Sequence, residues 1–501
     1  MSRINFNVNS LIAQRTLANN NKQLTKTLER LATGSRINRG GDDPAGLIAS
    51  EKLRAEKSAI SSALANAQRA EQVVNIAEGG LAEVSSLLLE LQSLVGQTAS
   101  DAAFSDEEKE ATQVQIDNIL SAIDRIASVT SFQGTKLLNG NFDFQIANVN
   151  TNVTDIQVLE AKVPTDDKIT VNAIVTQSAQ HAGLHLSLGG TLDLAANSST
   201  FSFEVAGVKG TQLFSFGSGT TVDDIAQSIN NFKDVTGVSA AVNGGGITLK
   251  STEYGSSQFV SVKVRDTGGI VSGDGIHYLS ATDENEINTD VAASFAAAAQ
   301  AAIRDEGQDV GAVINGVKAR GNGRSVSINT DTLAVSFTLS GSLFNTPGNV
   351  AAFEITGGGA KFSIGTEVNL ANEVALGLPN VSARHLGNNT VGFLDSLRSG
   401  AENNVIDGSI TQAQKVVKTA IDQVTALRGR LGSFQSRVIG SAINSLNVAL
   451  ENVGAAESAV RDTDFAAETA SLTRNQILVA AATNALAIAN SQPQNVLALL
   501  G

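Results

Sequence analysis

Residues 53–95 read LRAEKSAISSALANAQRAEQVVNIAEGGLAEVSSLLLELQSLV, and apolar residues recur in this stretch at every seventh position. Two such rows, three residues out of phase, make the a/d seam of a coiled coil. At 1.5 Å per residue this seam predicts a helix of about 60 to 75 Å, weakened only at Gly79 and Gly80. The first row is Leu53, Ile60, Ala67, Val74, Leu81, Leu88 and Val95, and the second is Ala63, Ala70, Ala77, Val84 and Leu91.

A matching seam lies near the other end of the chain. It consists of Ile410, Val417, Val424, Leu431 and Val438, beside Ala413, Ala420, Leu427 and Phe434. From Ile439 the repeat continues one residue out of register, which we interpret as a change of supercoil phase. Isolated helices cannot bury such seams, so the N-terminal and C-terminal helices should pack on each other or on other molecules. We expect the inner core at Leu53, Ile60, Val74, Leu81, Leu88, Val424, Leu431 and Phe434.

Two outer helical arms are expected beyond these seams. The N-terminal arm ends at Gly34, and the C-terminal arm has Pro493 near its end. Both carry small apolar residues that offer too little surface for a monomeric core, so we expect them to be disordered until partners arrive. The expected assembly contacts are Leu17, Leu24, Leu28, Leu31, Leu472, Val479, Leu486 and Val496.

The middle of the chain has a different composition. Most of the 46 glycines and 19 phenylalanines lie between residues 140 and 400, and alternating runs such as Phe201–Val205 predict strands. The predicted fold is therefore multidomain α+β: a long antiparallel helical coiled-coil bundle formed by both chain termini, with an inserted β-rich outer region. We expect terminal arms at 1–43 with 462–501, a helical core at 44–165 with 380–461, and β-rich domains at 166–379.

The composition favours a structural role over catalysis. The chain has no cysteine, no tryptophan and four histidines, so we expect no enzyme activity, no metal site and no cofactor. His181 and His185 are four residues apart, but the run at 184–188 alternates as a strand, so we expect a solvent-facing pair rather than a metal site. Adjacent Asp42 and Asp43 before Pro44 are expected to cap a helix.

Charge and hydropathy exclude further classes of protein. The formal net charge of −14 argues against nucleic-acid binding, and no apolar run is long enough to span a membrane. The first ten residues lack the apolar segment of a signal peptide. Cations dominate the first 41 residues and anions the last 40, which could reflect pairing of the arms or an ordinary solvated helix face.

The flanks resemble bacterial flagellin. The similarity rests on INFNV at 4–8, LATGSRIN at 31–38, DDPAG at 42–46 and FQGTKLLNG at 132–140, and on DTDFAAE at 462–468 and ANSQPQNVLALL at 489–500. It covers roughly residues 1–140 and 395–501. Residues 201–251 resemble, more weakly, an inserted β-motif of some flagellin outer domains.

The resemblance implies a subunit of the flagellar filament, secreted without a cleaved signal through the flagellar type III apparatus. It also implies several partners: further copies of the chain, an export chaperone at the C-terminal helix, hook-associated and cap proteins, and O-linked glycans on the middle zone. Rival interpretations are a hook-filament junction protein and a surface adhesin carried on the same termini. Members recognised by the animal innate immune receptor carry a receptor patch that aligns with Glu90, Leu94 and Gln115. Here a glutamate replaces the arginine and a glutamine the glutamate, which weakens the expectation of recognition.

Overall fold

The computed structural model describes residues 7–99, 105–164, 167–195, 199–271, 273, 275–280, 283–330, 332–341, 343–344 and 348–500. Side chains are also not described at 289–292 and 493–500. The chain divides into two compact units. The arm unit comprises Met1–Gln72, Ser363–Asn372 and Ser433–Gly501, and the body unit comprises Val73–Phe362 and Glu373–Gly432. The three-domain division predicted from the sequence stays a prediction.

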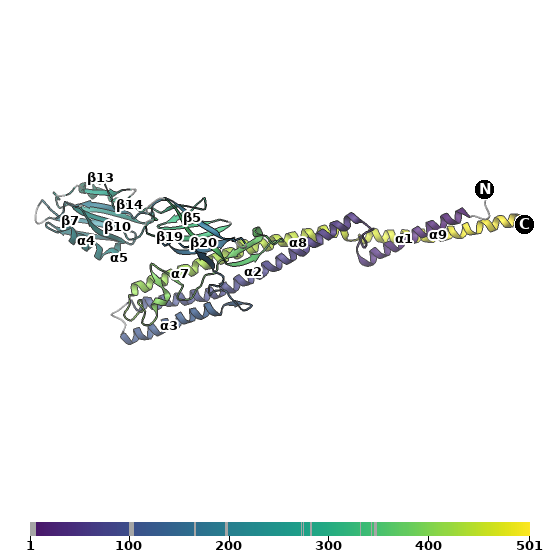
Figure 1. Cartoon of the computed structure of the whole chain (residues 1–501), viewed down its shortest axis with the longest axis horizontal. Coiled ribbons are helices and arrows are strands. Elements are labelled where there is room, and N and C mark those ends of the chain that lie inside the picture. Colours follow the sequence, from purple (N-terminus) through teal and green to yellow (C-terminus); the bar gives the residue numbers. More distant parts are fainter. Residues whose placement is uncertain are drawn as a thin grey trace. The chain divides into compact units, whose positions relative to one another are not determined.

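The arm unit is built from helices. Helix α1 (Val8–Thr33) runs beside α9 (Phe465–Leu500) in Figure 1, so the arms are a helical pair rather than disordered segments. The N-terminal part of α2 (Pro44–Gln97) is joined to α8 (Gly440–Arg461) by an ion pair between Lys57 and Glu457, with 3.1 Å between Nζ and Oε2. Gly34 ends α1 in the left-handed conformation with φ 68°, as predicted. A short 3-10 helix, η1 (Leu370–Asn372), completes this unit.

A π-helix explains the slip in the C-terminal heptad repeat. Between α7 (Ile410–Ser433) and α8 lies η3 (Phe434–Ile439), whose wider turn accommodates one extra residue. The slip predicted between Val438 and Ile439 falls within this element. The sequence therefore located the irregularity but assigned it to supercoil phase rather than to a π-helix.

Helix α3 (Asp106–Val129) is tied into the body unit through its contact with a 3-10 helix near residue 396. Ser105 and Glu108 form the predicted capping box at its start. The buried side chain of Gln113 donates from Nε2 to the Leu397 carbonyl at 2.8 Å and accepts from the Val405 amide at 2.9 Å. These bonds fix the segment around the 3-10 helix η2 (Leu394–Leu397) against α3. The small hairpins of this part are β1 (Ser131–Phe132) with β2 (Thr135–Lys136) and β23 (Gly387–Asn388) with β24 (Gly392–Phe393).

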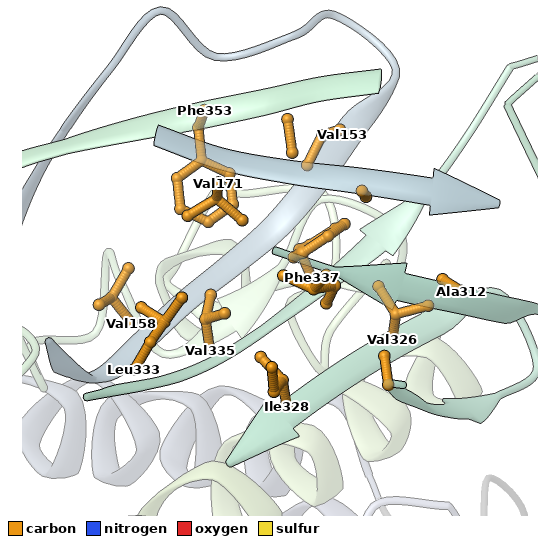
Figure 2. Close-up of a cluster of buried hydrophobic side chains, with 14 of the residues drawn as sticks. Val153, Val158, Val171, Ala312, Val326, Ile328, Leu333, Val335, Phe337 and Phe353 are labelled. Carbon is orange, nitrogen blue, oxygen red and sulfur yellow. The ribbon is translucent and has the colours of Figure 1, made fainter. Parts of the chain in front are cut away.

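A first β-module packs two antiparallel sheets face to face. Its core is the cluster of Figure 2, in which Phe337 and Phe353 meet edge to face with ring centroids 5.6 Å apart. The larger sheet has the order β16-β15-β5-β20-β3 and the smaller β17-β18-β19-β4. The strands are β3 (Phe144–Ala147), β4 (Val153–Ala161), β5 (Ile169–Gln177), β15 (Gly311–Ile314), β16 (Val317–Lys318), β17 (Arg320–Asn322), β18 (Ser325–Asn329), β19 (Leu333–Leu339) and β20 (Gly348–Gly358). Strands β21 (Ala360–Ser363) and β22 (Glu373–Leu376) pair separately.

A second β-module is inserted into the first between residues 180 and 308, where an isolated antiparallel bridge joins Gln180 to Gln308. Phe201, Phe203 and Val205 alternate into its core, as the sequence predicted for this strand. Its sheets have the orders β13-β12-β6-β10-β9 and β14-β11-β7-β8. The elements are β6 (Gly183–Ser187), β7 (Thr200–Gly207), β8 (Thr211–Gly217), α4 (Val222–Asn231), α5 (Lys233–Thr236), β9 (Val238–Asn243), β10 (Gly246–Ser251), β11 (Phe259–Asp266), β12 (Gly275–Leu279), β13 (Ile287–Ala293), α6 (Phe295–Gln300) and β14 (Ile303–Glu306).

Candidate assembly surfaces

The two arms are held together by polar bonds spaced along their length. Asn7 Nδ2 donates to the Ala489 carbonyl at 2.8 Å, and Asn20 Nδ2 donates to the Leu478 carbonyl at 3.2 Å. Further along, Asn475 Nδ2 donates to Thr27 Oγ1 at 3.0 Å. These bonds fix the antiparallel register of α1 against α9.

Charge complementarity contributes little to this pairing. Arg30 and Glu468 form one ion pair across the arms, at 3.8 Å, and the other cations near Arg30 bond elsewhere. Lys26 pairs with Asp42 at 2.9 Å, and Arg36 Nη2 donates to the Val460 carbonyl at 2.8 Å. The cations Lys26 and Arg36 are therefore bonded at the base of the arms, and of these three cations only Arg30 pairs with an anion of α9 in the part of the chain that the structure describes.

The residues predicted as assembly contacts differ in burial. Most are half-buried, as expected for a two-helix seam with one open side: Leu17, Leu24, Leu31, Leu472, Val479 and Leu486. Leu28 is 48% exposed. Val496 lies in α9 but among the residues whose side chains fall outside the described part of the chain.

A wider exposed apolar surface runs along both arms. We call it the arm surface, and it comprises Leu11, Ile12, Leu28, Ile477, Leu478 and Ile488, which are between 43% and 66% exposed. Soluble proteins rarely leave contiguous apolar surface open unless it binds something. The heptad analysis missed Ile12, Ile477, Leu478 and Ile488, because they lie off the seam positions. The available signal was the high apolar content of α9 on all of its faces.

The base of the arms is fixed by main-chain bonds between the two ends of the chain. The Arg36 amide donates to the Arg461 carbonyl at 2.7 Å, and the Thr463 amide donates to the Gly34 carbonyl at 2.9 Å. Between them, Ser35 and Asp462 form an isolated antiparallel bridge. This joint anchors both arms at one point.

Asp42 and Asp43 organise the turn that leads into α2. Asp43 Oδ1 accepts the Gly46 amide at 2.9 Å, which confirms the predicted cap for Asp43 but not for Asp42. Asp42 Oδ2 accepts the amides of Asn38 and Arg39. The bond to Lys26, followed by these amide bonds, lowers the pKa of Asp42 to about 2, so its carboxylate stays charged across the physiological range.

The predicted inner-core residues differ in burial. Ile60, Val74, Leu81, Leu88, Val424, Leu431 and Phe434 are each less than 8% exposed, whereas Leu53 is half-buried. Of the three residues aligned with the family's receptor patch, Glu90 and Gln115 are exposed and Leu94 is half-buried. Leu89 and Val114, next to two of them in sequence, are 56% and 58% exposed.

The prediction of a solvent-facing histidine pair is wrong for His185. Its side chain is 5% exposed, because every residue of β6 except Ser187 is buried. Its Nδ1 lies 3.1 Å from Thr248 Oγ1, and the ring of His277 lies opposite on β12 with centroids 6.2 Å apart. Burial, reinforced by the neighbouring His277, lowers the pKa of His185 to about 4. His181 is half-buried, and its ring lies against that of Tyr254 with centroids 3.7 Å apart and planes tilted by 34°.

Among the residues that the structure describes, no helix is long and apolar enough to cross a membrane. Within the same residues, no three histidine or acidic side chains converge in a geometry that could hold a metal ion.

Comparison with protein families connects these surfaces to a known class. Residues 4–143 match the bacterial flagellin N-terminal helical region, and residues 414–500 match the bacterial flagellin C-terminal helical region. The chain belongs to the bacterial flagellin family. It is thus a structural subunit of the flagellar filament. Residues 200–253, in the second β-module, match the flagellin hook IN motif.

Full-length relatives carry the same family name. The chain is 27% identical to flagellin A of Helicobacter pylori, 28% to B-type flagellin of Pseudomonas aeruginosa and 27% to flagellin of Salmonella typhimurium, each over 99% of both chains. Solved structures align more loosely. The flagellar cap protein of Escherichia coli matches at TM-score 0.26 and 17% identity, covering 49% of this chain and 63% of that one. Hook associated protein-3 of Legionella pneumophila matches at TM-score 0.25 and 11% identity, covering 85% of this chain and 99% of that one.

Proposed function

We propose that this flagellin self-assembles through the arm surface, so that its copies form a filament outside the cell that serves swimming motility. The observation that carries this proposal is the exposure of the six residues of the arm surface, at 43% to 66% each, with Val8 and Phe465 of the same helices exposed at 52% and 56%. Burying one leucine or isoleucine fully is worth about 1.5 to 3 kcal/mol, so a few such residues supply much of a subunit contact. The cost of association takes up part of this gain.

The polar bonds between the arms support two separate roles for the apolar residues of α1 and α9: holding the two helices together and binding the next copy. Because Asn7, Asn20 and Asn475 hold α1 and α9 in register, the residues of the arm surface keep fixed positions along the helical pair. The predicted contacts Leu17, Leu24, Leu31, Leu472, Val479 and Leu486 then hold the pair together, and Leu28 belongs to the face that binds the next copy. Val496 remains a proposed assembly contact.

Further partners are proposed by family resemblance. The exposed side of α9 suits an export chaperone that would cover Ile477 and Ile488 before assembly. Hook-associated and cap proteins would meet the two ends of the filament. Serine and threonine residues of the β-modules are candidate acceptors of O-linked glycans. The substitutions at Glu90 and Gln115 argue against recognition by the innate immune receptor.

The test is electron microscopy of purified monomer after filament seeds are added. The full chain should elongate the seeds into long filaments, and a variant lacking residues 1–40 and 465–501 should not. A matched control is a variant that lacks the second β-module, residues 182–306, and keeps both arms. It should still elongate, since the arm surface is intact.

Other outcomes would favour the rival interpretations. Short caps or monomers from the full chain would indicate a hook-filament junction protein or a surface adhesin. Elongation by the truncated variant would show that the arms are dispensable, and the proposed interface would then be wrong.

A further inference from the structure

The two β-modules contact each other at more than the two chain segments that connect them. The chain enters the second module at Gln180 and leaves it at Gln308, and these residues exchange main-chain hydrogen bonds of 2.9 and 3.0 Å. A connection of this kind leaves relative motion of two domains as the default expectation. A third segment, the loop 252–258 between β10 and β11, also contacts the first module. We call it the latch loop.

The Asp309 carboxylate binds the latch loop. Asp309 lies where the chain re-enters the first module, and its Oδ1 accepts the amides of Ser256 at 3.1 Å and Gly323 at 2.7 Å. Its Oδ2 accepts the Ser256 hydroxyl at 2.5 Å. Burial alone would raise the pKa of Asp309, but the bonds from Ser256 and Gly323 lower it below its usual value. One charged carboxylate therefore joins a loop of the second module to the turn between β17 and β18 of the first.

Tyr254 adds an apolar contact from the latch loop. Its ring packs against the hydrophobic core of the first module, where it meets the Phe344 ring edge to face with centroids 5.1 Å apart. The Cζ of Arg324, also in the first module, lies 5.1 Å from the centroid of the same tyrosine ring. Edge-to-face aromatic pairs and cation–π contacts both have preferred geometries, so they favour one placement of the loop over others.

Glycines permit the close approach of the main chains at this junction. A Cβ on Gly255 would lie 2.6 Å from Asp309 Oδ1 and 2.9 Å from the Cα of Gly323. A Cβ on Gly307, in the second connecting segment, would lie 2.4 Å from the Gly255 carbonyl oxygen and 2.9 Å from that of Gln180. Any side chain at either position would push the main chains apart. The latch loop is therefore in direct main-chain contact with both connecting segments.

We propose that the latch loop fixes the second β-module at one orientation to the first, with Asp309 as its binding partner. The inference does not rest on the proposed self-assembly, because every contact lies within one chain. Ser256 and Asp309 belong to neither hydrophobic cluster of the two modules, so breaking their bonds should free the orientation without unfolding either module. In a filament, the surface that the second module presents would then keep a fixed direction relative to the first module.

The test measures the distance between the two modules in the monomer. The chain has no cysteine, so two introduced cysteines can be labelled selectively. Val208→Cys, in the turn between β7 and β8, and Val317→Cys, on β16, place one spin label in each module, because these valines are 48% and 45% exposed. Double electron–electron resonance then gives the distribution of distances between the labels. The labelled chain should give one narrow distribution, and Asp309→Ala should widen it about twofold or more.

The matched control is Asp266→Ala. Asp266 is an exposed aspartate of the second module, and its Oδ1 accepts the Gly268 amide of the same module at 3.0 Å. Its replacement should leave the width of the distribution unchanged. Ser256→Ala removes only the hydroxyl bond, so it should widen the distribution less than Asp309→Ala. Circular dichroism and the thermal midpoint of each variant would show whether the modules remain folded.

Three results would overturn the proposal. Equal widths for Asp309→Ala and Asp266→Ala would show that the carboxylate does not fix the second module. A broad distribution in the labelled chain without further substitution would show that the modules move freely. If Asp309→Ala failed to fold, Ser256→Ala would decide, and a width equal to that of Asp266→Ala would count against the latch loop. The measurement uses the monomer, so a failure of the proposed self-assembly would leave its outcome unaffected.

Discussion

Gly80 shows that a residue read as a weak point of a helix can be required by packing. A Cβ on Gly80 would come within 2.8 Å of Thr130 Oγ1 and 2.9 Å of Leu138 Cδ1, whereas a Cβ on Gly79 would meet nothing within 4 Å. Gly80→Ala should therefore lower the free energy of unfolding by about 1 to 3 kcal/mol through overpacking. Gly79→Ala should raise it by up to about 1 kcal/mol, since alanine is the better helix former.

Urea unfolding of the two variants, followed by far-ultraviolet circular dichroism, would measure both changes. The two glycines are adjacent in one helix, so each variant controls for the other. Equal shifts in the same direction would contradict this account. Because the contacts of Gly80 are made by residues 50 and 58 positions away, the seam pattern alone could not distinguish it from Gly79.

His185 predicts a pH dependence for the second β-module. Its pKa of about 4 in the folded state lies below the value of about 6.5 expected in the unfolded chain, so folding disfavours the bound proton. The stability contributed by neutral His185 is fully present above pH 6.5 and is lost as the pH falls through 4. The total loss should be roughly 3 kcal/mol. His185→Gln should remove this part of the pH dependence.

Tyrosine fluorescence suits this measurement. The chain has no tryptophan and two tyrosines, Tyr254 and Tyr278, and Tyr278 lies on β12 of the same sheet as His185. Unfolding would be followed between pH 7 and 4 in the wild-type chain, in His185→Gln and in His385→Gln, which removes an exposed histidine outside this module. An unchanged pH dependence in His185→Gln would show that another group titrates.

At the scale of elements, η3 predicts which deletions the C-terminal helices tolerate. Removing Ser436 would convert the π-helix into an α-helical turn and place both halves of the repeat in one register. Each residue of an α-helix turns the chain by about 100°. Removing exposed Val448 from α8 would therefore rotate the half-buried Val453 and Val460 away from their seam.

Circular dichroism and thermal unfolding of the monomer would compare these two deletions. The Ser436 deletion should keep the helix content and change the free energy of unfolding by at most about 1 kcal/mol. The Val448 deletion should lower the free energy of unfolding by about 2 kcal/mol or more. A larger loss from deleting Ser436 would show that the π-helix itself is required for packing.

Sequence periodicity predicted the elements whose burial has a regular period, and it failed where burial depends on distant strands. The heptads of 53–95, the capping box at Ser105 and the alternation of Phe201 to Val205 all follow local rules. The order of the sheets does not, since β6 pairs with β10 and β12, which lie far along the chain. His185 was misassigned for the same reason, because both faces of β6 are covered by segments that no local pattern reveals.

At the scale of the whole molecule, the arm surface combines exposure in the monomer with burial in the proposed filament. Replacing Ile477 and Ile488, which are 63% and 66% exposed, by asparagine should leave the monomer almost unchanged. Each replacement should raise the critical concentration for seeded growth by about tenfold or more, since it removes roughly 1.5 to 3 kcal/mol of burial from the contact.

The control is Leu472→Asn, whose side chain is half-buried in the arm unit. Because leucine at this position helps to hold the arms together, its loss should lower the helix content of the monomer as well as filament growth. Analytical ultracentrifugation and circular dichroism would report the monomer, and turbidity after seeding would report growth. Normal growth by the double variant at Ile477 and Ile488 would mean that the exposed side of α9 faces solvent or a channel in the filament, and the interface would then have to lie on α1.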